Sequence, residues 1–332
     1  MSAQDDLLLD VEGLNVRFAT PEGPIHAVNG IDLKLHKGET LALLGESGSG
    51  KSVTMQAVIG LVRSPPGTVT ATHARFDGMD LMALKPAELR KVRGPRIAMI
   101  FQDPFMSLDP TKTVGSQIGE MFRVHRGASR AEARKNALEM MDRVRIPAAA
   151  ERIDDYPHQF SGGMSQRIVI ASAIALDPDL VIADEPTTAL DVTVQAQIMD
   201  LLNELRREMG MTMILITHDL ALAAETADRA AIMYGGRIVE TGPMESVFSD
   251  PRHPYAIGLL QSIPSMEGGT DRLQPILGTP PKLTRAPDRC SFEPRCAWSR
   301  PRCTAELPPL RTLAPARRCA CHFAEEIAHD DA

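Results

Sequence analysis

Residues 45–52 read GESGSGKS, and this stretch decides the fold of the chain. It fits the pattern G-x-x-x-x-G-K-[ST] and lies between TLALL (40–44), apolar like a buried strand, and a segment with a helical pattern. Glycines let successive backbone N–H groups turn toward phosphate oxygens, and the following helix adds its positive N-terminal end. The stretch therefore predicts a phosphate-binding loop, made of Gly45, Glu46, Ser47, Gly48, Ser49, Gly50, Lys51 and Ser52.

Four side chains along the chain suit a nucleoside triphosphate and its magnesium ion. Lys51 can reach the β- and γ-phosphates, and the Ser52 hydroxyl can ligate Mg²⁺. LVIADEP (180–186) reads as an apolar strand that ends in two carboxylates. Asp184 is suited to the Mg²⁺ shell, and Glu185 to orienting or deprotonating the attacking water. The combination indicates a nucleoside triphosphatase site.

The chain alternates strand patterns with helix patterns, which predicts an α/β fold with a mainly parallel sheet. Apolar runs of strand length are IAMIF (97–101), LVIA (180–183) and TMILI (212–216). A helix is predicted over 191–209, with Gly210 as its stop, and a hairpin over 231–242. Beyond about residue 245 prolines multiply and periodicity fades. We therefore expect a nucleotide-binding domain at 1–245 and a C-terminal extension at 246–332.

Composition and charge limit the classes of partner. The net charge of −7 argues against broad binding to nucleic acid, which needs a clear basic footprint. The acidic start MSAQDDLLLD does not resemble a signal peptide, and no run approaches the eighteen or so apolar residues of a spanning helix. We expect a cytosolic chain, in which structural disulfides are rare.

FSGGMSQR (160–167) resembles the signature motif of the ATP-binding cassette (ABC) ATPases, and it lies just upstream of LVIADE as in that family. Further elements follow in the family's order: Gln102 in IFQDP, Asp191 in TALD and His218 in ITHD. The resemblance implies a P-loop NTPase with a RecA-like core and a helical subdomain that carries the signature. A small, irregular, cysteine-rich extension would follow.

The resemblance also implies a role for each matching residue. Gln102 is similar to the Q-loop glutamine, which reaches Mg²⁺ and the attacking water. Asp191 is similar to the D-loop aspartate, and His218 to the switch histidine that bonds the γ-phosphate. Glu185 would be the catalytic carboxylate. Phe18, in the early strand LNVRF, looks like the aromatic that stacks on adenine, with a plain core position as the alternative.

In this family the signature acts on nucleotide held by another subunit. The resemblance implies that Ser161, Gly162 and Gly163 bind the γ-phosphate of ATP in the opposite subunit, helped by helix N-terminal polarity. The chain has one phosphate-binding loop and one signature, so it must dimerise to complete a site. A heterodimer with a second ABC ATPase subunit is favoured, and a homodimer is the alternative.

Three local stretches resemble the ATPase subunits of oligopeptide/dipeptide importers, a group that includes nickel and opine systems. They are RGPRIAMIFQDPFMSLDP (93–110), DPRHPYAIGLLQSIP (250–264) and CSFEPRC (290–296). The resemblance implies a motor that couples ATP hydrolysis to peptide uptake. It would work peripherally at the cytoplasmic face of the plasma membrane, with two transmembrane permease subunits and an extracytoplasmic solute-binding protein. Nickel or opine uptake is an alternative, and a soluble mechanical ATPase is a rival.

All five cysteines lie in the last part of the chain, with none before Cys290. Disulfides are not expected in the cytosol, and structural zinc usually shows C-x₂₋₄-C pairs. Widely spaced thiolates on an irregular scaffold suit an iron–sulfur cluster better, with Zn²⁺ as the alternative. Some importers that this tail resembles carry a [4Fe–4S] cluster there. The resemblance assigns Cys290, Cys296, Cys303 and Cys321 as its ligands and leaves Cys319 as a spare.

Overall fold

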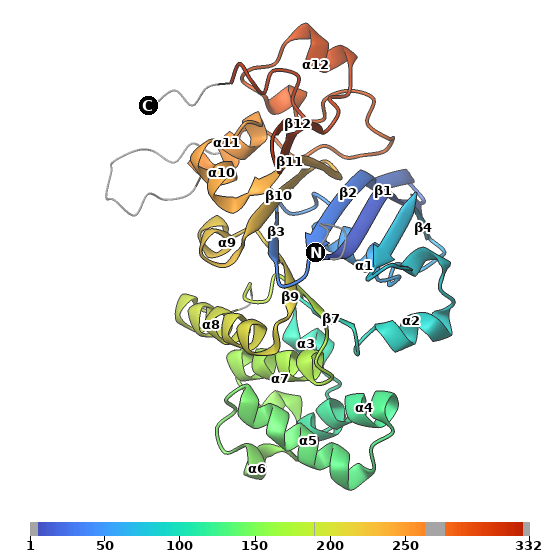
Figure 1. The fold of residues 1–332 in the computed structure, drawn as a ribbon, viewed down its shortest axis with the longest axis vertical. Helices are drawn as coiled ribbons and strands as arrows, with labels where there is room; N and C mark the ends of the chain where they lie inside the picture. The colour runs from blue at the N-terminus through green and yellow to red at the C-terminus, as the bar shows by residue number, and fades with distance from the viewer. Residues whose placement is uncertain (1–5, 189, 263–275, 328–332) are drawn as a thin grey trace. The chain divides into compact units, whose positions relative to one another are not determined.

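The computed structural model describes residues 6–188, 190–262 and 276–327, and both β-sheets and α-helices build the fold (Figure 1). The chain divides into two compact units. The first unit joins Met1–Ala83 to Leu215–Ala332, and the second unit is Leu84–Ile214. The α/β class predicted from the sequence is confirmed.

An antiparallel sheet formed by the N-terminal residues belongs to the first unit. Its order is β2-β1-β5-β6, and β4 also pairs with β1. Alternate residues of β1 are buried, among them Leu9, Val11 and Val16, as expected for a strand with one face on the core. The bounds are β1 Leu7–Thr20, β2 Gly23–His36, β4 Gly67–Thr70, β5 His73–Phe76 and β6 Met79–Asp80.

The other sheet of the first unit has the order β12-β13-β11-β10-β3-β9. Strand β10 runs parallel to β3, but β11, β13 and β12 continue the sheet in antiparallel fashion, so this part departs from the predicted parallel arrangement. The hairpin predicted over 231–242 is confirmed as β10 and β11. The bounds are β3 Thr40–Leu44, β9 Thr212–Thr217, β10 Arg229–Tyr234, β11 Arg237–Pro243, β12 Arg311–Ala314 and β13 Arg317–Cys319.

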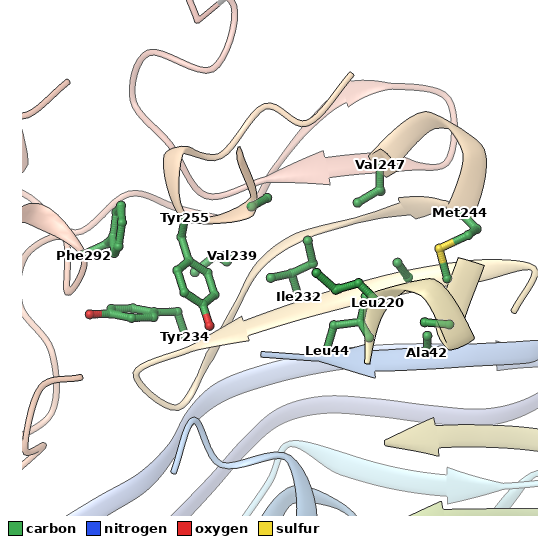
Figure 2. Close-up of a cluster of buried hydrophobic side chains, with 13 residues drawn as sticks. Ala42, Leu44, Leu220, Ile232, Tyr234, Val239, Met244, Val247, Tyr255 and Phe292 are labelled. Atoms are coloured by element: carbon green, nitrogen blue, oxygen red, sulfur yellow. The ribbon is translucent and has the colours of Figure 1, made fainter. Parts of the chain in front are cut away.

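Helices and a buried cluster of apolar side chains complete the first unit. The cluster joins Leu44 of β3 and Ile232 of β10 to Val247, Tyr255 and Phe292 of the C-terminal extension (Figure 2). The extension therefore shares the core of the unit instead of forming a separate one. The helices are α1 Lys51–Val58, η1 Leu81–Ala83, α9 Leu220–Thr226, α10 Met244–Ser249, α11 Pro254–Gln261, η3 Glu293–Arg295 and α12 Pro301–Ala305.

The second unit is mainly helical and also contains β-strands. Strands β7 (Ile97–Ile100) and β8 (Leu180–Asp184) pair in parallel, and β9 begins in this unit at Thr212. Helices α4, α5 and α7 pack on one another (Figure 1). The helices are α2 Pro86–Val92, α3 Pro104–Ser107, α4 Val114–Arg126, α5 Arg130–Arg143, α6 Ala149–Arg152, η2 Pro157–Gln159, α7 Gly162–Ile174 and α8 Val192–Met209.

Helix α8 illustrates how local sequence sets the ends of an element. The Asp191 side chain accepts from the Val194 N–H at 3.0 Å and caps the first turn. Gly210 takes a left-handed conformation, with φ 63°, and ends the helix where the sequence predicted. In the described part of the chain, no helix is both long and apolar enough to cross a membrane.

Candidate functional site

The GESGSGKS loop connects the buried strand β3 to helix α1, as its motif predicts. Gly45 has φ 145°, and a Cβ there would lie 2.3 Å from the Met233 carbonyl oxygen, so only glycine fits. Gly50, with φ 103°, precedes Lys51, the first residue of α1. The backbone thus takes the sharp turn that brings loop N–H groups around the positive end of a helix.

Lys51 lies inside this loop and is only 5% exposed. Its Nζ donates to the carbonyl oxygens of Gly45 at 2.7 Å and Glu46 at 3.1 Å. Ser47 and Gly48 are exposed, Ser49 is buried, and Ser52 is half-buried in the first turn of α1. The carbonyl oxygens of the phosphate-binding loop therefore orient the buried Lys51 ammonium.

Gln102 and Glu185 meet at the carboxyl ends of β7 and β8 in the second unit. Ile100 pairs with Ala183 in the parallel register, so each site residue stands two positions beyond a paired residue. The Gln102 Nε2 donates to Glu185 Oε2 at 3.0 Å, and Thr188 Oγ1 donates to the same oxygen at 2.9 Å. Glu185 has φ 46°, an uncommon conformation for a residue with a side chain, and such conformations cluster at functional sites.

Three further predicted residues take these places. Asp184 is the last residue of β8 and is only 5% exposed. His218 follows β9 and is exposed, immediately before Asp219, which caps α9. Phe18 is half-buried on β1, opposite Ile25 of β2 and Gly67 of β4. Its intermediate burial fits neither a fully packed core residue nor a fully exposed one.

The signature residues begin helix α7, and they lie against the start of α8. The Ser161 Oγ accepts from the Met164 N–H at 3.4 Å as the N-cap. A Cβ at Gly163 would lie 2.7 Å from Val194 Cγ1, so the two helix starts approach as closely as glycine allows. Asp191 caps α8 three residues before Val194. The signature and the D-loop aspartate are thereby brought together within the second unit.

The extension carries a cavity that four cysteines share. Cys290, Cys296, Cys303 and Cys321 line it together with Phe292 and His322, and the Cys290 N–H donates to the Cys303 carbonyl at 3.1 Å. Cys319 lies in β13, opposite Glu240 of β11, and does not line the cavity. Within the described residues, no three or more His, Cys, Asp or Glu side chains converge as a ready metal site. The four thiols line one cavity, but within the described residues they do not form a complete set of metal ligands.

Burial favours the neutral thiol at three of the cavity cysteines, Cys290, Cys296 and Cys321. It raises the pKa of Cys296 to about 12 and that of Cys321 to about 11, and it also raises the pKa of Cys290. A bound metal would reverse this preference because it ligates the thiolate.

Two residues that sequence reasoning did not assign to the site bind its phosphate loop. The Glu46 N–H donates to Tyr255 Oη at 2.8 Å, and the Glu46 carboxylate accepts two hydrogen bonds from Arg295. Both partners belong to stretches that the sequence analysis used only for family resemblance. The signals were HPY (253–255) and the Pro294-Arg295 pair before Cys296, but neither indicates a contact more than 200 residues away.

Comparison with known proteins agrees with these motifs. Residues 28–188 match the ABC transporter family model, and residues 239–303 match the model of the oligopeptide/dipeptide transporter C-terminal region. The chain is 47% identical to the dipeptide transport ATP-binding protein DppD of Escherichia coli (strain K12), over 95% of this chain and 96% of that protein. It is 50% identical to a candidate peptide import ATP-binding protein of Brucella abortus (strain 2308), over 95% and 94% of the two chains.

Solved structures are similar to the cassette part of the chain. One is the dimeric post-hydrolysis state of the ATP-binding cassette MJ0796 with ADP and phosphate. Its TM-score is 0.63 at 29% identity, covering 71% of this chain and 98% of that chain. With relatives this similar along nearly their whole length, the protein belongs to the ABC transporter family of ATPases, in the group marked by the oligopeptide/dipeptide transporter C-terminal region.

Proposed function

We propose that the protein is the ATP-hydrolysing motor subunit of a membrane importer of di- or oligopeptides. The Gln102–Glu185 hydrogen bond carries this proposal, because it orients a carboxylate beyond a buried strand where a catalytic base is needed. Relatives named for peptide import and dipeptide transport support peptides as the solute class. Nickel or opine uptake by the same kind of motor is the alternative, and a mechanical ATPase remains the rival class.

Each site residue has a proposed part in ATP hydrolysis. Lys51 contacts the β- and γ-phosphates, cradled by the loop N–H groups of residues 45–52. Ser52 and Asp184 would hold Mg²⁺, and Gln102 would be a further ligand. Glu185 orients and deprotonates the attacking water. His218 bonds the γ-phosphate, and Phe18 stacks on adenine.

The active form that we propose is a dimer of cassettes. Ser161, Gly162 and Gly163 start a thirteen-residue helix, whose positive end suits the γ-phosphate of ATP bound to the other subunit. Asp191 lies beside them. The partner is a second ABC ATPase, favoured as a different chain, with a homodimer as the alternative.

The dimer would drive two transmembrane permease subunits from the cytoplasmic face of the plasma membrane, with cargo delivered by an extracytoplasmic solute-binding protein. ATP binding closes the cassettes, and hydrolysis resets them. Residues 1–245 are the proposed motor domain, and 246–332 the importer-type extension. Nucleic acid is not a proposed partner, which is in keeping with the net charge of −7.

In the cysteine cavity we propose a [4Fe–4S] cluster held by Cys290, Cys296, Cys303 and Cys321, with Zn²⁺ as the alternative. The shared cavity supports four thiolate ligands. A [4Fe–4S] cluster takes four thiolate ligands, and four cysteines line this cavity. Its binding free energy would help to fold the proline-rich extension.

The cluster is tested by anaerobic purification of the full chain. We expect brown protein with broad absorbance near 400 nm and about four iron atoms per chain. Colourless protein with one zinc atom per chain would instead support the zinc alternative. Protein that carries neither metal would contradict both.

Uptake tests the transport function directly. The chain is co-purified from solubilised membranes and reconstituted in vesicles with the permeases that accompany it. ATP-dependent uptake of labelled di- or oligopeptides is expected, with Ni²⁺ and an opine as competing substrates. Co-purification of ribosomes or nucleic acid without permeases would favour the mechanical ATPase.

A further inference from the structure

Glu46, the second residue of the phosphate-binding loop, is tied to the C-terminal extension by its backbone and its side chain. Its N–H donates to Tyr255 Oη at 2.8 Å. Its carboxylate accepts from Arg295 Nη1 at 2.8 Å and from Nη2 at 2.9 Å. The side chain of Arg295 is 5% exposed and that of Glu46 is 26% exposed, so this bidentate ion pair is largely shielded from water.

Every N–H donor of the Arg295 guanidinium has an acceptor. Besides the two bonds to Glu46, Nε donates to the Leu277 carbonyl at 2.9 Å. Nη1 donates to Tyr234 Oη at 3.3 Å, and Nη2 donates to the Ile276 carbonyl at 3.3 Å. The planar fork is therefore fixed in one orientation. A lysine has no such fork and could replace the arginine only in part.

The short turn that carries Arg295 is bounded by two cysteines of the cavity. Cys290 and Cys296 stand at its ends, and both pack against the buried apolar cluster. Between them, Phe292 places its ring 5.1 Å from Tyr234 and 5.4 Å from Tyr255, measured between ring centroids (Figure 2). The same turn thus carries Arg295, which binds Glu46, and Phe292, which packs against Tyr255. Tyr255 is the other residue that binds Glu46.

His253 explains why Tyr255 reaches the loop. Its Nδ1 accepts from the Tyr255 N–H at 3.0 Å and caps the start of α11. The phenol ring is fully buried, with its oxygen at Glu46. The sequence HPY (253–255) therefore fixes the start of α11, and its tyrosine, Tyr255, binds the phosphate-binding loop.

Lys51, the lysine of the phosphate-binding loop, also contacts Glu46. The Glu46 carbonyl accepts from Lys51 Nζ at 3.1 Å, while the carboxylate of the same residue is held by Arg295. A shift of Glu46 would move an acceptor that orients the lysine. Position matters here because phosphate binding needs loop groups placed in advance.

We propose that Arg295 is a positioning residue for nucleotide binding. It fixes Glu46 and with it the phosphate-binding loop, and it makes ATP affinity depend on the turn between Cys290 and Cys296. The proposal rests on the proposed role of this loop in binding ATP. It gives the extension a part in the motor's own chemistry, in addition to any structural role.

The first experiment measures the ATP dissociation constant and the ATP-induced rise in unfolding temperature of the full chain. Arg295→Gln and Glu46→Gln should each weaken ATP binding about tenfold, the scale of losing hydrogen bonds to a charged partner. Arg295→Lys should recover only part of this loss. The double variant should bind no more weakly than either single one, because both remove the same interaction.

Arg302→Gln is the matched control, since Arg302 forms an exposed pair with Glu306 in the same extension. A purely structural role would lower the unfolding temperature without ATP but leave the ATP-induced rise intact. An unchanged ATP-induced rise in the variants would overturn the proposal. So would wild-type ATP affinity in the single variants, or losses of affinity that add up in the double variant. If the wild-type chain itself binds no ATP, the proposed function fails and not this inference alone. Should Arg295→Gln not fold, Glu46→Gln still decides.

The second experiment tests the dependence on the cysteine turn. Cys296→Ala should weaken ATP binding several-fold in the wild-type background and have no further effect in Arg295→Gln. Cys319→Ala is the control, because this buried cysteine lies outside the cavity. Equal losses in both backgrounds, or no loss in the wild type, would show that the turn does not act through Arg295.

Discussion

Gln102 and Glu185 are joined by a hydrogen bond of 3.0 Å between the amide Nε2 and the carboxylate Oε2. They lie 83 residues apart in the chain, and the parallel register of β7 and β8 brings them together. This hydrogen bond orients the Glu185 carboxylate, which would activate the attacking water. Glu185 and not Gln102 would accept the proton, because an amide is not a base.

Replacing the amide should therefore reduce the rate of hydrolysis more than binding. We expect Gln102→Ala to lower kcat roughly tenfold or more, the scale of one hydrogen bond to a charged group. The ATP dissociation constant should change little, since the loop of residues 45–52 is untouched. Single-turnover hydrolysis together with equilibrium binding separates the two. A variant that binds poorly but turns over normally once saturated would show that Gln102 serves binding instead.

Lys51→Ala should weaken ATP binding at least tenfold, because it removes the charge that we propose contacts the β- and γ-phosphates. Equilibrium binding of ATP measures this. The control is Lys135→Ala, since the side chain of that lysine is 77% exposed on α5 and pairs with Glu139 on the surface of the same helix. Unchanged ATP affinity in Lys51→Ala would remove the lysine from the site.

His253 should make stability depend on pH. Complete burial lowers the pKa of this imidazole from 6.5 to about 3, so the folded protein keeps it neutral while the unfolded chain protonates it below about pH 6.5. The unfolded state then binds more protons, and stability rises with pH between about 3 and 6.5. The contribution of the neutral imidazole to stability is fully present above about pH 6.5. The loss on acidification is at most about 1.4 kcal/mol per pH unit.

His253→Asn should remove this dependence, because asparagine can still cap α11 but does not titrate. Urea unfolding at pH 5.5 and 7.5 compares the two proteins. The carboxylate of Glu240, which accepts from the His253 backbone N–H at 2.8 Å, is present in both, so the difference isolates the imidazole. Parallel pH profiles of the wild type and variant would refute the assignment.

The isolated chain should hydrolyse ATP slowly, since its signature residues would act on nucleotide held by a partner. Turnover per chain should rise with protein concentration or on adding the partner ATPase. Analytical ultracentrifugation alongside the assay gives the oligomeric state. Robust, concentration-independent hydrolysis by a demonstrated monomer would contradict a composite site.

Much of this architecture could be predicted from the sequence, because the signals are local. The strands β3, β7, β8 and β9 appear as short apolar runs, and Asp191 and Gly210 mark the ends of α8. The loop of residues 45–52 is a contiguous motif whose sharp turns are made by its own glycines. Family membership followed from motifs in a fixed order, and the comparisons confirm it.

What the sequence did not reveal depends on long-range pairing. The antiparallel addition of β13 to β11 joins segments about eighty residues apart, and short polar strands such as RRC give no periodic signal. The Arg295–Glu46 pair spans 249 residues. An arginine in a proline-rich tail reads as a surface residue until the fold places it against the loop.

The most direct measurement of the central account is ATP hydrolysis by Glu185→Gln in the reconstituted importer, with ATP binding measured on the same preparation. Glu225→Gln, an exposed carboxyl on α9, is the control. The account predicts that Glu185→Gln retains ATP binding while turnover falls at least ~10²-fold, the scale of a positioned acid–base group. Near-normal hydrolysis by Glu185→Gln would contradict the account.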